Sequence, residues 1–245
     1  MTYCVGLKLD RGLVFMSDTR TNSGVDNIST FRKMFTWSKP GERFITLLTA
    51  GNLATTQTVV SLLEERTKAP SERTPSILEV PSIFQAASLV GQTLREVIQS
   101  TEPTGETANS TFSASIILGG QIGDGEPRLF LIYPEGNFIE TSSDTPFFQI
   151  GETKYGRPIL VRSYEPDMSF EDAVKLLLVS FDSTIKANLS VGLPLDLQIY
   201  RNSMYKADIE RRFDEKDSFY QSISNGWGEA LKDALNSLPN INFNN

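Results

Sequence analysis

The stretch MTYCVGLKLDRGLVFMSDTR, residues 1–20, decides the fold of this chain of 245 residues. Side chains alternate in character over residues 2–9, and a second apolar run covers residues 13–18, so two strands are predicted. The sequence Asp10-Arg11-Gly12 between them is typical of a three-residue hairpin loop in which glycine takes a positive φ. The segment is therefore expected to fold as an antiparallel hairpin that brings its two ends together.

The register of this hairpin determines what lies beside the start of the chain. A three-residue loop would pair Cys4 with Asp18 and Thr2 with Arg20, because the length of the loop determines which residues of the two strands lie opposite each other. A carboxylate and a guanidinium are thus expected near Thr2, whose hydroxyl group is a candidate nucleophile.

Composition excludes several classes of site. The chain has no histidine, so neither a Ser-His-Asp or Cys-His site nor an imidazole-based zinc site is available within one chain. The single cysteine, Cys4, excludes an internal disulfide, fits a reducing cytoplasm and is expected to be a small buried residue. A net charge of −7 disfavours nucleic acid and anionic membranes as partners. No apolar run approaches the roughly 20 residues of a membrane span. We expect a soluble cytoplasmic protein without metal or cofactor.

Without histidine, a general base would have to be a carboxylate, a lysine, a tyrosine or the α-amino group. The α-amino group has a reference pKa of about 7.7–8.0, close to physiological pH without any tuning. Methionine aminopeptidases remove Met1 when the next residue is small, and Thr2 would then carry a hydroxyl and a free amine together. Asp18 and Lys33 are the charges most easily brought near it, and Gly51 could offer a backbone N–H to an oxyanion. The residues alone leave open a plain strand-end threonine and a structural ion pair.

The rest of the chain alternates between groups of strands and pairs of helices. This order favours two antiparallel sheets stacked between helical layers over a βαβ sheet, in one α+β domain. Residues 22–29 are expected to be a polar loop and residues 206–217 a solvated charged face. Turns are expected at Gly119-Gly120 and at two later glycine-containing sites. Strands are predicted at residues 33–37, 43–49, 113–119, 128–133, 138–141, 147–150 and 193–200, and helices at 55–68, 83–99, 151–164 (interrupted by Pro158), from Ser169 onward, and at 227–238.

Several segments, in order, resemble proteasome β-type subunits. The first is TYCVGLKLDRGLVFMSDTR, with a threonine, a strand, a glycine turn and an Asp-x-Arg element, followed by Lys33. The later ones are TAGNLATTQTVVSLLEE, LFLIYPEGNFIE, FFQIGETKYG and MSFEDAVKLLLVSFDST, so the likeness covers residues 2–200. Within that family, NLSVGLP and the long C-terminal tail are most similar to Anbu, the bacterial ancestral β-subunit type. The ring-forming bacterial protease HslV is the alternative.

The resemblance implies a four-layer αββα sandwich and N-terminal-nucleophile chemistry on peptide or other amide bonds. It implies that Thr2 is the nucleophile and its amine the general base. It also implies that Asp18 and Lys33 tune the nucleophile, that Arg20 orders the surroundings of Asp18, and that Gly51 supplies the oxyanion hole.

One element departs from the family pattern. The family has Asp-x-x-Ser-Gly in support of the amine of the nucleophile, whereas this chain has Asn188 at the Asp position and Val191 at the Ser position. Ser190 lies one residue early and is the candidate for the serine role. A neutral Asn188 would hold the amine less strongly than a carboxylate, so a proteasome-like scaffold that binds without cutting remains an alternative, as does a small-molecule amidohydrolase.

The resemblance also implies self-association in a large homo-oligomer, either a ring or an open spiral, and it leaves the ATPase partner unknown. The predicted domain covers residues 1–200, and residues 201–245 form a C-terminal extension. The extension carries large apolar side chains, including Phe219, Trp227 and Leu235, which would form an exposed patch on a monomer. We expect it to pack on neighbouring subunits or on its own domain.

Overall fold

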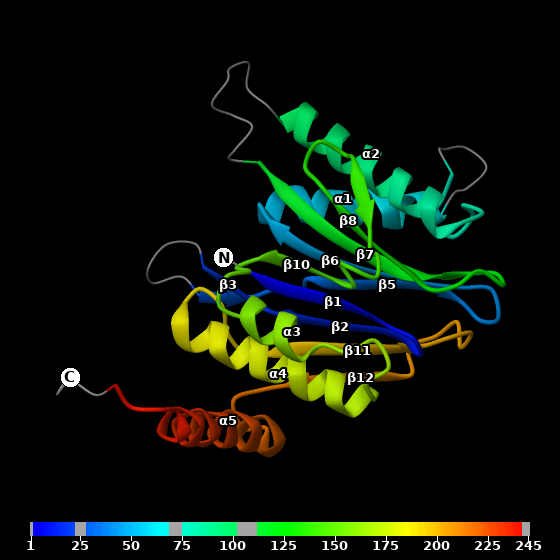
Figure 1. Cartoon of the computed structure of the whole chain (residues 1–245). Coiled ribbons are helices and arrows are strands. Elements are labelled where there is room, and N and C mark those ends of the chain that lie inside the picture. The colour runs from blue at the N-terminus through cyan, green and yellow to red at the C-terminus, as the bar shows by residue number, and fades with distance from the viewer. Residues whose placement is uncertain (1, 23–27, 69–74, 102–111, 242–245) are drawn as a thin grey trace.

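The computed structural model describes residues 2–22, 28–68, 75–101 and 112–241. Two five-stranded antiparallel sheets pack face to face, and each outer face carries a pair of helices (Figure 1). The helices α1 (Leu53–Lys68) and α2 (Ile83–Thr101) cover one sheet, and α3 (Arg157–Ser163) and α4 (Phe170–Ala187) cover the other. The predicted four-layer αββα sandwich is therefore confirmed.

The first sheet is built around the N-terminal hairpin. Its strand order is β10-β1-β2-β11-β12, so the hairpin lies in the middle and later parts of the chain flank it. The strands are β1 (Tyr3–Leu9), β2 (Gly12–Asp18), β10 (Phe147–Gly151), β11 (Leu195–Arg201) and β12 (Ile209–Phe213).

The second sheet follows chain order, β5-β6-β7-β8-β9, with all neighbours antiparallel. Short connections join these strands except between β6 and β7, where α1 and α2 intervene. A separate two-stranded ribbon projects beyond the end of β2. The strands of the second sheet are β5 (Met34–Lys39), β6 (Arg43–Gly51), β7 (Ala114–Ile122), β8 (Arg128–Ile132) and β9 (Phe138–Glu140), and those of the ribbon are β3 (Arg20–Asn22) and β4 (Ile28–Thr30).

Strand β1 shows how the sequence alternation is used. Tyr3, Val5 and Leu7 join the core beneath α4, whereas Cys4 joins the core between the two sheets. Both faces of the strand are thus covered, and nearly every residue of β1 and β2 is buried. Because each fully buried large apolar side chain contributes about 1.5–3 kcal/mol, these two short strands anchor two of the three cores.

The hairpin register differs from the prediction by one residue. Leu9 pairs with Gly12 and Cys4 with Ser17, so the connection is a two-residue turn at Asp10 and Arg11. The alternation could not decide the register, because it does so only where one face is buried and the other is solvated. As a consequence Asp18 lies beside Tyr3 instead of Cys4.

Other boundaries also differ from the prediction. The polar loop expected at residues 22–29 overlaps the end of β3 and the start of β4. The strand β12 lies within residues 206–217, and its first four residues are exposed, as expected for a solvated face. Gly119 and Gly120 lie inside β7, not in a turn, and a Cβ at Gly120 would lie 2.0 Å from the carbonyl oxygen of Phe44 on the neighbouring strand. Pro158 lies in the first turn of α3, where proline is tolerated, so it does not interrupt a longer helix. The polar segment expected around residues 102–110 lies outside the described residues.

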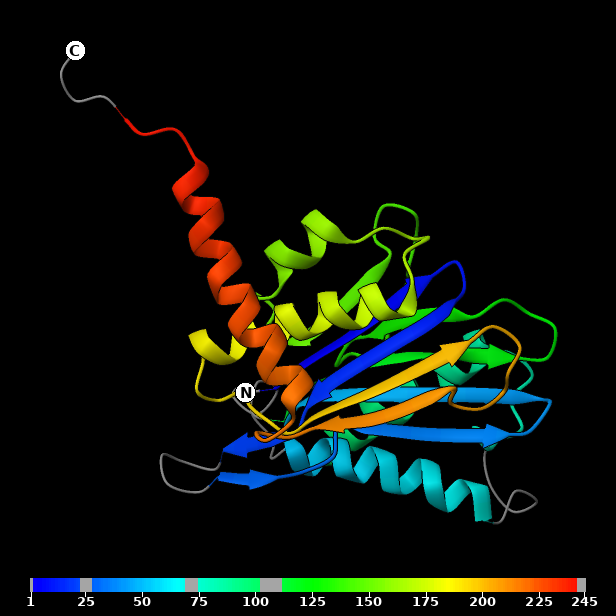
Figure 2. The same cartoon turned by 90° about the horizontal axis from the view of Figure 1, so that it is seen from below.

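The last helix, α5 (Ser218–Ser237), begins nine residues before its predicted start at residue 227. The side chain of Asp217 caps it by accepting a hydrogen bond from the backbone N–H of Tyr220. Its first turns pack on α4, and the rest extends away from the sandwich (Figure 2). Among the described residues, the structure has no helix long and apolar enough to cross a membrane.

Candidate active site

Thr2 lies at the entrance of strand β1, where the backbone is fixed by the neighbouring strand. Its carbonyl oxygen accepts a hydrogen bond of 2.6 Å from the backbone N–H of Glu152, directly after β10. A Cβ at Gly151, whose φ is +83°, would lie 1.9 Å from that same carbonyl oxygen. Only glycine therefore permits this approach. The result is a half-buried Thr2 whose backbone position is set by β10.

A buried ion pair lies one residue from Thr2. The Asp18 carboxylate accepts hydrogen bonds from the backbone N–H of Tyr3 at 3.0 Å and from the Lys33 ammonium at 2.7 Å. The side chains of Asp18 and Lys33 are 0% and 4% exposed. Lys33 also donates to the backbone carbonyl of Arg20 at 2.6 Å. The structure thus brings together the two charges that the sequence analysis placed near Thr2.

The buried environment of the Asp18–Lys33 pair raises the pKa of the acidic groups in it. Burial raises the pKa of the Asp18 carboxyl group above its ordinary 3.8, and Lys33 and the N–H of Tyr3 oppose that rise. Burial and then the charge of Asp18 raise the pKa of the Cys4 thiol far above its usual range. Cys4 is therefore a protonated, fully buried thiol, and the prediction that it is a small buried residue is confirmed.

Arg20 holds the loop that follows α4. Its guanidinium donates to the backbone carbonyl of Leu189 at 3.2 Å, and a Cβ at Gly192 would lie 2.4 Å from that guanidinium. Its side chain therefore positions this loop, while its backbone carbonyl contacts Lys33.

The loop contains the residues at which the chain departs from the family pattern. Asn188 is the C-cap of α4, and its side-chain oxygen accepts from the backbone N–H of Ser190 at 2.9 Å. Its side-chain nitrogen donates to the Glu152 carboxylate at 2.9 Å. Val191 is fully buried in the core beneath α4, and Ser190 is half-buried. Sequence reasoning missed Glu152, although its position after a glycine that ends a strand was a usable signal.

Gly51 ends β6 with a φ of +113°, and a Cβ there would lie 2.4 Å from the carbonyl oxygen of Ser113. Two residues before Gly51, the backbone N–H of Thr49 donates to the backbone carbonyl of Lys33 at 2.9 Å. The structure thus places the end of β6 beside the segment that carries Lys33.

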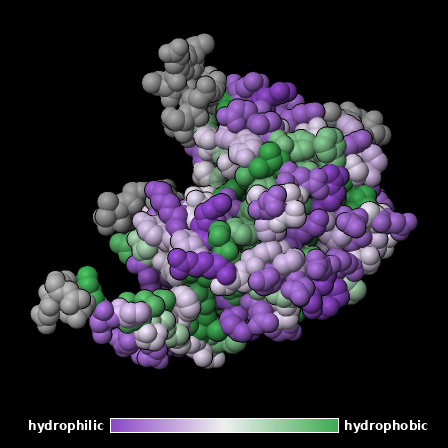
Figure 3. Space-filling model, viewed as in Figure 1, coloured by the Kyte–Doolittle hydropathy of each residue, from purple (hydrophilic) through white to green (hydrophobic). Residues whose placement is uncertain are grey.

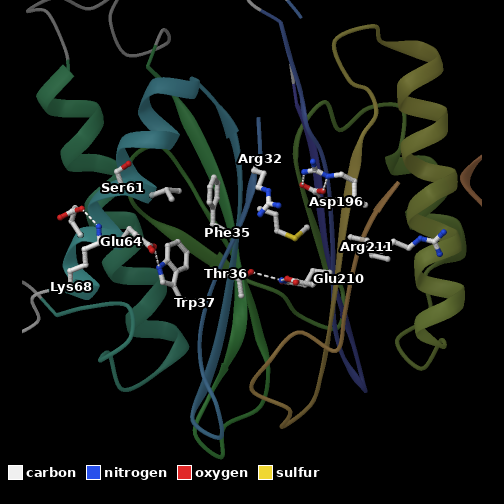
Figure 4. A pocket seen from close by; sticks show the side chains of 16 residues that line it. Arg32, Phe35, Thr36, Trp37, Ser61, Glu64, Lys68, Asp196, Glu210 and Arg211 are labelled. Carbon is white, nitrogen blue, oxygen red and sulfur yellow. Dashed lines mark hydrogen bonds and ion pairs between the residues drawn. The ribbon is translucent and has the colours of Figure 1, made fainter. Parts of the chain in front are cut away.

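A cavity of about 830 Å³ lies elsewhere, between α1, β5 and the β11–β12 edge of the first sheet (Figure 4). Buried Gln198 donates to Thr36 at 2.9 Å and to Glu210 at 2.7 Å, and this polar network joins the two sheets. The cavity wall includes Arg32 but none of the predicted site residues. Geometry and charge therefore favour the Thr2 region over this cavity as the candidate active site.

An αββα sandwich with a threonine at the entrance of a central strand, beside a buried Asp–Lys pair, is the combination that the resemblance to proteasome β-type subunits predicts. The chain belongs to the proteasome subunit family, whose model matches residues 2–193. It is 25% identical over 200 residues to proteasome subunit beta 2 of Pyrobaculum calidifontis, covering 80% of this chain and 86% of that protein.

Within the family, the chain is similar to Anbu, the ancestral β-subunit. It is 46% identical to the structure of Anbu from Yersinia bercovieri, with a TM-score of 0.92, covering 99% of this chain and 100% of that one. It is 47% identical to Anbu in a helical assembly of the complex from Pseudomonas aeruginosa, with a TM-score of 0.91 and 98% of each chain covered. These likenesses extend over the C-terminal segment that the family model leaves unmatched.

Proposed function

We propose that this protein is an N-terminal threonine hydrolase that cleaves peptide or other amide bonds, with Thr2 as the nucleophile after removal of Met1. The observation that carries the proposal is the Asp18 carboxylate, which joins the Lys33 ammonium to the peptide N–H that follows Thr2. This arrangement holds a positive charge two hydrogen bonds from the peptide that follows Thr2, and such a charge would stabilise an alkoxide on Thr2 in a water-poor site. Met1 itself lies outside the described residues.

The chemistry follows from these groups. The Thr2 hydroxyl oxygen attacks the amide carbonyl carbon, and the Thr2 amine takes the hydroxyl proton. The negative charge of the tetrahedral intermediate develops on the carbonyl oxygen, for which we assign the backbone N–H of Gly51 as a donor. The carbon–nitrogen bond then breaks, and the ammonium returns the proton to the leaving amine. Water, deprotonated by the Thr2 amine, hydrolyses the ester, so that the acid and free Thr2 are released.

A covalent probe directed at N-terminal threonine tests this proposal. A peptide epoxyketone should add its full mass to the N-terminal peptide, because it reacts with both the hydroxyl and the amine of Thr2. Intact mass must first show that Met1 is absent. A protein with a free Thr2 terminus that neither gains this mass nor hydrolyses a peptide library would refute the proposed hydrolase.

The second candidate function is a proteasome-like scaffold that assembles and binds without cutting. Asn188 favours it, because a neutral amide stands where the family pattern has a carboxylate. The probe experiment separates the two candidates, since a scaffold would retain assembly and show no adduct.

We further propose that the protein forms a homo-oligomer through α5. The first turns of this helix contact α4, where Tyr220 donates to Asp182 at 3.2 Å and Lys186 donates to Ser224 at 2.9 Å. Beyond these contacts α5 leaves the sandwich, and hydrophobic side chains show on it in the space-filling view (Figures 2 and 3). Its exposed apolar side chains are Phe219, Leu231 and Leu235, with Leu238 at its end. The helical assembly of the Anbu complex from Pseudomonas aeruginosa supports this proposal.

Replacing Leu231 and Leu235 with aspartate should break the assembly into smaller species. These side chains are 49% and 70% exposed, so the substitutions leave the fold of one subunit intact. Each buried leucine contributes about 1.5–3 kcal/mol at an interface, so the dissociation constant should rise at least about 100-fold. Sedimentation velocity at micromolar concentration measures the change.

The matched control is Asn236→Asp, which adds one charge in the same turn and should leave the assembly unchanged. Point substitutions are sharper than removal of residues 217–245, because that truncation also removes Tyr220, which is buried against α4. A wild-type protein that sediments as a monomer would contradict the proposed oligomer.

A further inference from the structure

The environment of Glu152 differs from that of an ordinary surface carboxylate. This residue is only 6% exposed, and its backbone N–H donates to the carbonyl of Thr2 at 2.6 Å. It directly follows Gly151, whose positive φ ends β10 at the point of closest approach to Thr2. The fold therefore holds a buried carboxylate on the residue next to the candidate nucleophile.

The side-chain partners of Glu152 are amide groups. One carboxylate oxygen accepts from the Asn188 side-chain nitrogen at 2.9 Å, and the other accepts from the backbone N–H of Lys154 at 3.4 Å. Within the part of the chain that the structure describes, Glu152 forms no ion pair. Burial of a carboxylate without a cation is costly, so this site is suited to a positive charge.

Removal of Met1 creates such a charge. The nitrogen of Thr2 is then an ammonium group, two covalent bonds from the carbonyl carbon whose oxygen is bonded to the N–H of Glu152. The other acidic group at this corner, Asp18, is already neutralised by Lys33 at 2.7 Å. The other charged side chains on the elements around this corner are Asp18, Arg20, Lys33 and Lys154, and the last turns of α4 add Asp182 and Lys186, which pair with each other at 2.9 Å.

We propose that Glu152 is the counter-charge that positions the α-amino group of Thr2, and that Asn188 is the residue that orients Glu152. This inference rests on the proposed function for the exposure of the Thr2 amine. It accounts for the departure at residue 188, because a carboxylate there would lie within hydrogen-bond distance of Glu152 and repel it. The Asn188 amide instead accepts from the N–H of Ser190 and donates to Glu152, so both of its ends are used. The carboxylate that supports the amine has thus moved from residue 188 to residue 152.

Glu152→Gln tests the proposal through the pKa of the Thr2 amine. A carboxylate within about 4–6 Å favours the ammonium form, so its neutralisation should lower the pKa of the amine by about 1–3 units. Competitive acylation followed by mass spectrometry measures this pKa on protein produced with methionine aminopeptidase. Any acid limb of kcat/KM should move to lower pH by the same amount. Glu171→Gln removes an exposed carboxylate from the first turn of α4 and is the matched control, with no expected shift.

An unchanged amine pKa in folded Glu152→Gln would overturn the inference, as would retention of Met1 after the aminopeptidase treatment. Should Glu152→Gln fail to fold, Asn188→Ala provides a second measurement. Loss of the donor frees the Glu152 carboxylate, so the amine pKa should fall by a smaller amount, and no change would overturn the inference. Competitive acylation measures the pKa of the Thr2 amine whether or not the protein has hydrolase activity. If Glu152→Gln lowers the amine pKa but the wild-type protein forms no probe adduct, the role of Glu152 is supported and the proposed hydrolase is refuted.

Discussion

Thr2→Ala should remove all probe adduct and lower kcat/KM for any amide substrate by at least about 10⁴-fold, since loss of a nucleophile disables the whole covalent route. The chain has no histidine to activate a serine, and the only thiol, Cys4, is protonated and fully buried. The fold should persist, because Thr2 is half-buried at a strand end and alanine keeps its Cβ. Mass spectrometry and fluorogenic peptide assays measure the two losses.

Thr2→Ser is the matched control for this prediction. Serine keeps both the hydroxyl and the amine, and serine and alanine are small enough to permit the removal of Met1. The serine variant should therefore form the adduct and the alanine variant should not. Wild-type hydrolysis by a purified Thr2→Ala protein that elutes with the folded species would rule out Thr2 as the nucleophile.

Lys33→Met should destabilise the fold by about 3–5 kcal/mol, because it leaves the Asp18 carboxylate buried without its cation. The side chains of the pair are 0% and 4% exposed, so solvent screens little of this loss. Chemical unfolding at fixed pH measures the change in the free energy of unfolding. A loss below about 1 kcal/mol would show that water or another cation already compensates Asp18.

The same variant should show a pH dependence of defined sign. Burial already raises the pKa of Asp18 in the folded protein above its ordinary 3.8, and removal of Lys33 raises it further. Between the unfolded and folded pKa values the folded state binds the additional proton, so its stability falls as pH rises. Lys33→Met should therefore lose more stability at pH 8 than at pH 5.

The double variant Asp18→Asn/Lys33→Met is the matched control. It removes both charges and keeps an amide oxygen as the acceptor for the N–H of Tyr3. It should be more stable than Lys33→Met alone and nearly independent of pH over this range, because breaking a buried pair costs more than replacing it. A double variant less stable than the single one would mean that Asp18 supports the fold by a route other than this pair.

The amino-acid sequence by itself determined the hairpin and the order of the main strands and helices, and it indicated the class of chemistry that we propose. Period-2 and period-3.6 patterns are local, so the four-layer arrangement could be predicted from groups of strands and pairs of helices. The absence of histidine is a property of composition alone, and it pointed to the α-amino group before any contact was known. The proximity of Asp18 and Lys33 to Thr2 followed from the hairpin and from the family resemblance.

Only the tertiary structure decided the register and the surroundings of the amine. Strands β1 and β2 are buried on both faces, so their alternation is compatible with either register, and only the three-dimensional structure shows that Leu9 pairs with Gly12. The contact between Glu152 and Asn188 joins residues 36 positions apart, and Glu152 itself lies 150 positions from Thr2. No local pattern encodes such distances. A local sequence therefore specifies which side chains share a face of a strand, whereas their partners across the fold depend on how the two sheets and α4 pack together.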